Sequence, residues 1–446
     1  MKARLLPVQL SETNQRERGE FEQQLRLLEK MYGAVADFLP VQPLEALDTQ
    51  GADACLFPQL IGSVFSHGAE FSLIDLPVLV LSSAFGTVEM WDWEIVAYLR
   101  ENLGLNVLSP YNEEMARVIM RALAAKREMR EGTRFLMFQD DPGEGMQASI
   151  FKRFYWWEKE STRRIENAFG IEIIYRSWKE VNLKAQAIPD EDAKKLWEER
   201  KVPTEGLDIG RILKAVKLYM AVKAAMDEIG GISGVGSNCL NESFHSQTTP
   251  CLAWNWMYEH DHIIWACEGD TLTLISKFIL YSILRRPMMM TNIYPFLMGM
   301  AALKHEKIDT FPQVEDPDHH ALGVHCGYFG LVPQSFCTHW TMRPRVLEIV
   351  NQDAVMLDCR MAEGPVTLAK LHTDMKKMTV IQAAIEDYVQ YPGSDCRNGC
   401  LLRYKHDSGH QVMESLSSHH QIIIQGDAVP LLVQAAKVFG FELEVI

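Results

Sequence analysis

The order of strand-like and helix-like runs constrains the fold of this chain more than any other feature. Up to about residue 300, short apolar runs such as Pro77–Ser82 alternate with longer runs that carry apolar residues at helical spacing, such as Arg16–Phe38. This alternation is typical of parallel sheets with crossover helices, whose strands are buried on both faces. It predicts two α/β domains, each with a Rossmann-like sheet.

The chain changes character near residue 320. From there to about residue 427, short β-rich segments broken by turns replace the long helices, and the closing stretch from Ala428 predicts a helix and a strand. Many short strands separated by turns indicate an antiparallel sheet or a small barrel. We therefore expect domains at 1–175, 176–315 and 316–446, of which the first two are α/β and the C-terminal one is β-rich and barrel-like.

Composition excludes several classes of protein. The 44 basic and 59 acidic side chains give a formal net charge of −15, so the chain should repel phosphate backbones and nucleic acid is not an expected partner. No apolar run reaches the about 18 residues of a membrane span, and the N-terminal apolar run is too short for a signal peptide. We expect a cytoplasmic protein with no membrane partner. The nine cysteines, an odd number without paired spacing, predict reduced thiols.

The stretch from residue 263 to 295 carries the strongest functional signal. The apolar run Ile263–Cys267 predicts a buried strand that ends at Glu268, and the next apolar strand, Met288–Met290, ends shortly before Asn292. Ligands of open α/β folds usually bind at the carboxyl ends of the strands. We therefore expect the two polar side chains to meet at one edge of a sheet and to hold a divalent metal and a sugar.

Histidine is concentrated in the second half of the chain, where 13 of the 14 histidines lie at or beyond His245. The pair His419 and His420 precedes an apolar strand, where two histidines are unusual as mere packing. His325 has an alternative interpretation as a turn histidine satisfied by backbone groups. Glu268 also has an alternative interpretation, because a carboxylate at this position can cap the following helix. Asp270 suits that capping role equally well.

Three motifs in this order resemble those of the L-fucose isomerase and L-arabinose isomerase superfamily. They are ACEGD at 266–270, GVHCGYFGLVPQSF at 323–336 and the C-terminal HHQIIIQGDAVPLLVQAAKVFGFELEVI. The change to β-rich character near residue 320 is also similar. The resemblance implies a metal-dependent aldose–ketose isomerase that acts on a small sugar and forms a homo-oligomer such as a hexamer. Mixed carboxylate and imidazole ligation favours Mn(II) or a related ion.

The resemblance also implies roles for single residues. Glu268 matches a glutamate that binds the metal and takes part in proton transfer, and His420 matches the histidine ligand shared by both branches. His325 matches a ligand of the arabinose-type branch, and His419 matches a position that lines the active site in the fucose-type branch. The expected metal ligands are Glu268, Asn292, His325 and His420, and the expected catalytic residues are Glu268, Asn292 and His419.

Asn292 departs from the family pattern, because the family has an acidic metal ligand at this position. An amide can offer its carbonyl oxygen to a metal, but it cannot take a proton. Either the acid/base work is redistributed, to Asp270 or to an ordered water, or the chemistry has changed. Moving a carbonyl from C1 to C2 of a sugar needs a stabilised enediolate and a proton shuttle, for which Glu268 is the first candidate.

Two other functions fit the same sequence. The first is an isomerase or epimerase for an anionic sugar, such as a sugar acid or the sulfo-sugar sulfoquinovose, with cationic contacts from Arg285, Arg286, Arg343 and Arg345. The second is a non-catalytic sugar-binding or regulatory protein that has lost the base at Asn292. Proton exchange at C2 of the sugar separates an enzyme from a binding protein. No motif supports a nicotinamide cofactor or a covalent nucleophile.

Overall fold

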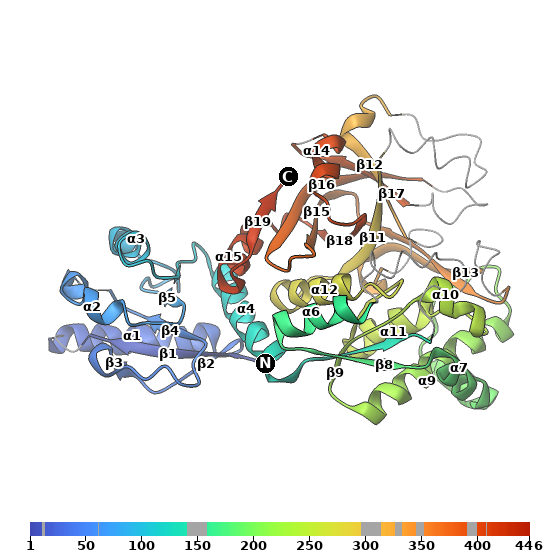
Figure 1. Ribbon diagram of the computed structural model, residues 1–446, viewed down its shortest axis with the longest axis horizontal. Coiled ribbons are helices and arrows are strands. Elements are labelled where there is room, and N and C mark those ends of the chain that lie inside the picture. Colours follow the sequence, from blue (N-terminus) through green and yellow to red (C-terminus); the bar gives the residue numbers. More distant parts are fainter. Residues whose placement is uncertain are drawn as a thin grey trace. The chain divides into compact units, whose positions relative to one another are not determined.

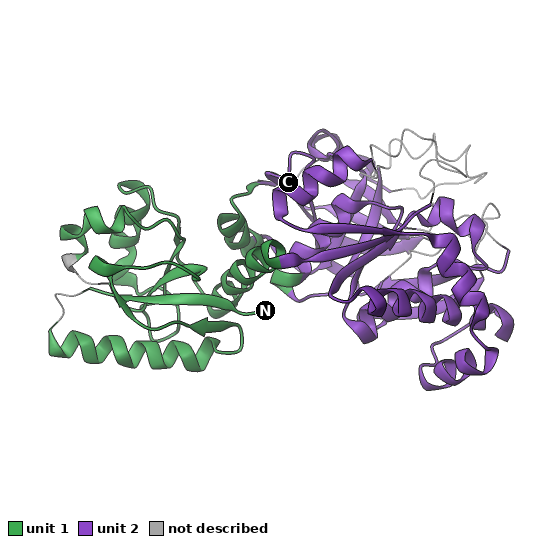
Figure 2. Ribbon diagram, turned by 60° about the horizontal axis from the view of Figure 1, so that its bottom comes forward, with its two compact units in different colours: residues 1–131, 282–284, 430–442 green, residues 132–281, 285–429, 443–446 purple. Residues whose placement is uncertain are grey.

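The structure is a computed structural model that describes residues 1–10, 14–60, 62–140, 158–295, 314–325, 332–344, 352–389, 399–406 and 408–446. The chain forms two compact units, which Figure 2 shows in separate colours. Unit 1 comprises residues 1–131, 282–284 and 430–442, and unit 2 comprises residues 132–281, 285–429 and 443–446. Within the described residues, no helix has the length and apolar character needed to span a bilayer.

Unit 1 is built on a parallel sheet with the strand order β2-β1-β4-β5-β6, and β3 also pairs with β1. Figure 1 labels the strands β1 to β5 of this sheet. The strands are β1 Ala3–Gln9, β2 Ala36–Phe38, β3 Gln42–Pro43, β4 Ala54–Phe57, β5 Val78–Val80 and β6 Val107–Leu108. The helices are α1 Gln15–Tyr32, α2 Gly68–Phe71, α3 Trp93–Glu101, α4 Glu113–Gly132 and α15 Val429–Phe439. Strands β4 and β5 are buried at every position, as expected for parallel strands covered on both faces.

The helix predicted over Arg16–Phe38 is shorter than its apolar pattern suggests. A capping box formed by Asn14 and Glu17 starts α1, and the helix ends at Tyr32. The residues that follow form β2, which pairs in parallel with β1. The apolar spacing continues past Tyr32, but there it serves a strand, because pairing with β1 outweighs local helical periodicity.

Unit 2 contains a four-stranded parallel sheet with the order β10-β9-β7-β8. The strands are β7 Arg134–Phe138, β8 Glu172–Arg176, β9 Ile232–Ser237 and β10 Ile264–Ala266. The helices are α6 Lys159–Phe169, α7 Trp178–Ala187, α8 Asp190–Glu199, α9 Ile209–Ile229, α10 Cys239–Glu242, α11 Cys251–Asp261 and α12 Thr271–Leu284. Residue 175, where a domain boundary was expected, lies within β8 of this sheet.

The same unit contains a closed six-stranded antiparallel barrel, in which β15, β18, β11, β12, β17 and β16 follow one another and β16 pairs again with β15. The strands are β11 Met288–Pro295, β12 His320–Val324, β15 Gly364–Leu371, β16 Lys377–Val389, β17 Gly399–Tyr404 and β18 His420–Gln425. The remaining elements are the paired strands β13 Cys337–Pro344 and β14 Val355–Met361, helix α14 Gly409–Ser415 and strand β19 Glu442–Val445 on β16. The barrel-like expectation is confirmed, and closure removes the open edges of the sheet.

Strand β11 lies in the barrel and not in the parallel sheet that contains β10. The expectation that Glu268 and Asn292 follow neighbouring strands of one sheet is therefore wrong. A short apolar run such as Met288–Met290 suits a buried strand of either sheet type, so its local sequence could not decide between them. Its long-range partners β12 and β18 decide it.

Candidate functional site

Three neighbouring barrel strands bring Asn292, His325 and His420 together. Strand β11 lies between β12 and β18, and Asn292 is the register partner of Val324 on one side and of His420 on the other. His325 follows Val324 directly. Adjacent strands lie about 4.8 Å apart, so these residues are neighbours in the barrel although they are distant in the sequence.

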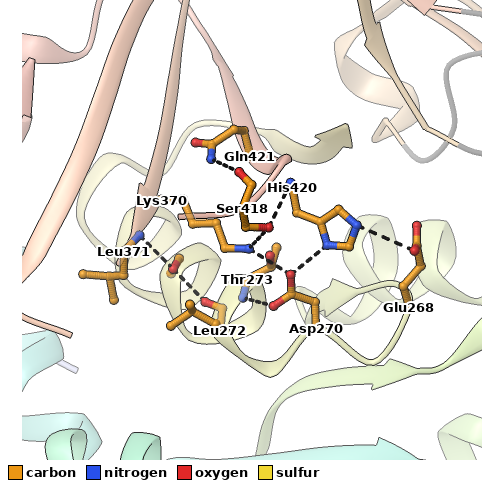
Figure 3. A network of polar contacts seen from close by, with 10 residues as sticks. Glu268, Asp270, Leu272, Thr273, Lys370, Leu371, Ser418, His420 and Gln421 are labelled. Carbon is orange, nitrogen blue, oxygen red and sulfur yellow. Dashed lines mark hydrogen bonds and ion pairs between the residues drawn. The ribbon is translucent and has the colours of Figure 1, made fainter. Parts of the chain in front are cut away.

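Glu268 reaches the same place from the parallel sheet, through a tight turn after β10. Its φ of 57° and the φ of 71° at Gly269 put both residues in the left-handed region. For a residue with a β-carbon this costs about 1–3 kcal/mol, and such strain is concentrated at functional sites. The turn places Glu268 Oε2 3.6 Å from His420 Nε2 (Figure 3).

Asp270 is the hub of a buried polar network that Figure 3 shows. Its Oδ1 accepts the backbone N–H of Thr273 at 2.7 Å and so caps α12. Its Oδ2 accepts from Lys370 Nζ at 2.8 Å and from His420 Nδ1 at 2.8 Å. The helix-cap interpretation thus holds for Asp270, and the same carboxylate also fixes a lysine and a histidine of the barrel.

This network decides which nitrogen carries the proton when the His420 imidazole is neutral. Burial acts to raise the pKa of Asp270, but the positive charge of Lys370 and the hydrogen bond from His420 hold it below its ordinary value. An ionised carboxylate can only accept hydrogen bonds, so Nδ1 of His420 must be the donor. Nε2, which faces Glu268, is the nitrogen left to bind a ligand, in the arrangement typical of metal-binding histidines.

The basicity of Glu268 depends on the charge of His420. Burial acts to raise the pKa of Glu268, but a protonated His420 lowers it to about 2. Burial acts to lower the pKa of His420, and the two carboxylates Glu268 and Asp270 raise it above its ordinary value. The two facing side chains therefore form an ion pair when no ligand is bound. If His420 is neutral, that effect disappears and burial raises the pKa of Glu268, which makes the carboxylate a better base.

His325 and Asn292 offer further groups to a ligand. Both ring nitrogens of His325 and Oδ1 of Asn292 are buried, and none of them has a hydrogen-bond partner in the described part of the chain. Burial lowers the pKa of His325 to about 4, so its imidazole is neutral at pH 7. His419 is exposed, and its ring centroid lies 4.4 Å from that of His420. It therefore stands at the rim of the site.

The predicted metal ligands are only partly brought together. In the ranges that the structure describes, no three His, Cys, Asp or Glu side chains form a metal-binding group. Glu268 and His420 do meet, and Asn292 is the register partner of His420. One carboxylate, one imidazole and one amide oxygen fit a divalent ion such as Mn(II) that still accepts oxygens from a substrate. Cys267 is buried next to Glu268, and Cys326 lies outside the described residues.

Two buried lysines belong to this region, and no motif in the sequence marks them. Lys370 lies on β15 and is 1% exposed. The only feature of the sequence that indicates burial of Lys370 is its position among apolar residues in a strand with few polar residues. Lys277 lies on α12, is completely buried and donates to Trp265 O at 3.1 Å, with its Nζ 3.3 Å from the centre of the Trp265 ring. Within the described residues, no carboxylate forms an ion pair with Lys277.

Burial lowers the pKa of Lys277 well below its ordinary value of 10.5, and this predicts a pH-dependent stability. The unfolded chain binds this proton more readily than the folded one, so the stability is lost as pH falls below about 10.5. Relative to Lys277→Met, we expect the wild-type free energy of unfolding to rise as pH rises toward 10.5, by up to about 1.4 kcal/mol per pH unit. Urea unfolding at several pH values measures this. Equal slopes would contradict the prediction, and the exposed Lys184→Met is the control.

Comparisons with known proteins do not assign a family. No protein-family model matches the chain, and no curated protein sequence matches it. The superfamily resemblance therefore stays a prediction from the three motifs. The support for a function comes from the geometry of the site together with those motifs.

Proposed function

We propose that this chain is a metal-dependent aldose–ketose isomerase that interconverts an aldose and its 2-ketose through an enediol, with Mn(II) as the expected ion. One observation carries the proposal: the Glu268 carboxylate faces His420 Nε2 at 3.6 Å, while Asp270 fixes His420 Nδ1 at 2.8 Å. The parallel sheets, taken as Rossmann-like domains, and the closed barrel agree with the architecture that the resemblance implies.

The proposed chemistry assigns a task to each residue of the site. Glu268 accepts the proton that leaves C2 of the open-chain aldose and returns it to C1. Glu268, His420 and the Asn292 amide oxygen would hold the ion, and the bound ion would supply positive charge opposite the oxyanion that develops during the proton transfer. His325 has two unbonded ring nitrogens among the described residues and is a further ligand candidate. The exposed His419 hydrogen-bonds a sugar hydroxyl at the rim.

Ketose formation tests this function. Protein stripped of metal with EDTA is given Mn(II) and a panel of neutral aldoses, uronic acids and sulfo-sugars. We expect one aldose to form its 2-ketose, and we expect EDTA to stop the reaction. Binding of metal and sugar without any ketose would support the non-catalytic sugar-binding alternative instead.

Replacing Asn292 by an acid tests its role. If the amide is a weakened form of the acidic family ligand, Asn292→Asp should raise kcat/KM by about tenfold, because a carboxylate binds a divalent cation more tightly and can take a proton. Steady-state kinetics with the best aldose and saturating Mn(II) measure the effect, with Asn106→Asp in unit 1 as a matched change. A loss of activity would mean that the substrate requires the amide.

The anionic-sugar alternative gains no support from Arg343 or Arg285. Arg343 pairs with Asp358 at 3.0 Å and with Glu205 at 2.7 Å. Arg285 ends α12 and lies over the Tyr281 ring, and at about 1.5 Å per residue it is roughly 22 Å along the helix from Asp270. Arg345 lies outside the described residues.

We also propose a cytoplasmic homo-oligomer. Four aromatic side chains in the segments that follow β5 and β6 of unit 1 are well exposed: Phe85 80%, Trp91 77%, Trp93 56% and Tyr111 80%. Phe85, Trp93 and Tyr111 line one surface pocket of this unit, and contiguous exposed apolar groups mark interaction surfaces. Sedimentation velocity should show an assembly larger than one chain, and a monomer at micromolar concentration would contradict it.

A further inference from the structure

A row of polar side chains crosses the carboxyl edge of the parallel sheet in unit 2, next to Glu268. Strand β9 lies between β10 and β7, and Gly236 is the register partner of Ala266 on one side and of Met137 on the other. The three strands therefore end level, about 4.8 Å apart. The residues two positions beyond these partners follow the same edge: Glu268, Asn238 and Gln139.

The members of this row beyond Glu268 have unsatisfied hydrogen-bonding atoms. Asn238 is completely buried, and in the described part of the chain neither Oδ1 nor Nδ2 of its amide has a partner. The same holds for Oγ of Ser237, which is also completely buried, and for Nε2 of Gln139. Buried polar groups are nearly always hydrogen-bonded, because leaving them unpaired is costly. This concentration at one edge therefore points to a ligand that supplies the missing partners.

The backbone around these groups is tightly fixed. The Gly269 N–H donates to Ser237 O at 2.9 Å and joins the turn of Glu268 to the end of β9. A β-carbon on Gly236 would lie 2.7 Å from Ala266 O, so the close approach of β9 and β10 requires glycine there. On the other side, the Asp140 N–H donates to Glu242 Oε1 at 3.0 Å. The backbone that carries the row is therefore fixed before any ligand binds.

The side chains of the row indicate which class of ligand it binds. An amide presents a donor and an acceptor side by side, and two neighbouring sugar hydroxyls present the complementary pair. The described side chains in and beside the row include the carboxylates of Asp140, Glu242 and Glu268, and negative charge disfavours a phosphate or sulfonate at this edge. Uncharged sugar hydroxyls match the donor and acceptor of the amide, and they carry no negative charge that the carboxylates would repel.

We propose that Ser237, Asn238 and Gln139 form an amide shelf that binds the uncharged hydroxyls of the sugar beyond C2, with Asn238 holding two neighbouring hydroxyls through Oδ1 and Nδ2. This inference rests on the proposed function, since it takes the reacting carbons to lie at Glu268. The shelf sets the position of the sugar chain and so selects among aldoses by the arrangement of their hydroxyls.

Binding of an unreactive polyol tests the shelf separately from turnover. The probe is the alditol obtained by reducing the aldose that the chain binds most tightly, and the affinity of this alditol is measured by calorimetry with Mn(II) present. Two lost hydrogen bonds correspond to about 10–100-fold weaker binding, so we expect Asn238→Ala to weaken alditol binding and to raise KM by this factor, with unchanged metal content. The isosteric Asn238→Asp keeps an acceptor, loses the donor and should also weaken binding.

A control variant separates ligand binding from structural damage. Asn182 is another buried amide of unit 2, and its Oδ1 accepts the Gln247 N–H at 3.3 Å. Asn182→Ala should lower stability and leave alditol affinity unchanged. Unchanged alditol affinity and KM in both Asn238 variants would overturn the shelf, while wild-type turnover would leave the isomerase proposal standing. A wild-type chain that binds neither alditol nor aldose would also overturn the shelf. Alditol binding that depends on Asn238, without turnover, would support the shelf and refute the isomerase.

Discussion

Glu268→Gln should lower kcat/KM by about 10²–10⁴-fold, the usual contribution of a general acid/base group. Glutamine preserves the size of the side chain, but it cannot take a proton and is a weaker ligand for a cation. The variant should therefore also lose most of its bound Mn(II). Steady-state kinetics and the metal content per chain after dialysis measure the two effects.

Two further variants test whether the loss of activity and of metal comes from the proposed site. His420→Ala removes the imidazole that faces Glu268 Oε2 at 3.6 Å, so it should lose metal to a similar extent. Glu228→Gln is the control, because that carboxylate is 74% exposed and pairs only loosely with Lys184 at 3.5 Å. Full metal content and full thermal stability in both site variants would show that the proposed site is wrong.

Lys370→Met should lower the free energy of unfolding by about 3–5 kcal/mol, because it leaves a buried carboxylate without its lysine. The two partners are almost fully shielded from solvent: the side chains of Lys370 and Asp270 are 1% and 0% exposed, and they lie 2.8 Å apart. His420 alone then has to balance both Glu268 and Asp270. Urea unfolding of the metal-free chain measures the loss.

Two further variants test whether the loss of stability arises because the Lys370–Asp270 pair is buried. The double variant Lys370→Met with Asp270→Asn should be more stable than Lys370→Met alone, since it removes the unbalanced charge and asparagine still caps a helix well. Lys377 and Glu444 pair at the same 2.8 Å but are 25% and 31% exposed. Lys377→Met should therefore lose only about 1 kcal/mol or less. Equal losses in Lys370→Met and Lys377→Met would contradict the account of the buried network.

The sequence predicted the fold well where short-range patterns determine it. Strands buried on both faces, such as β4 and β5, and the β-rich barrel after residue 320 follow from apolar runs and turn spacing. The sheet that contains β11 could not be predicted from the sequence, because Met288–Met290 fits either type of sheet. Only the pairing of β11 with β12 and β18 assigns it to the barrel. Long-range pairing of this kind leaves little trace in a local pattern.

The difference between local patterns and long-range contacts also explains which residues of the site the sequence predicted. The motifs singled out Glu268 and His420, which the structure brings together. Lys370 was missed, because its link to Asp270 spans 100 positions and its hydrogen bonds depend on the closed barrel. Asn238 was missed because its significance lies in being buried without a described partner, and only three-dimensional packing reveals this.

Isomerisation in D₂O tests the central claim most directly. The chain is incubated with Mn(II) and its best aldose, and both ketose formation and the C2 proton signal of the recovered aldose are followed by NMR. We predict ketose together with deuterium at C2, and we predict that both disappear in Glu268→Gln. Ketose without deuterium at either carbon would contradict an enediol route through an exchangeable proton on Glu268. Tight binding of metal and sugar with neither ketose nor exchange would contradict catalysis itself.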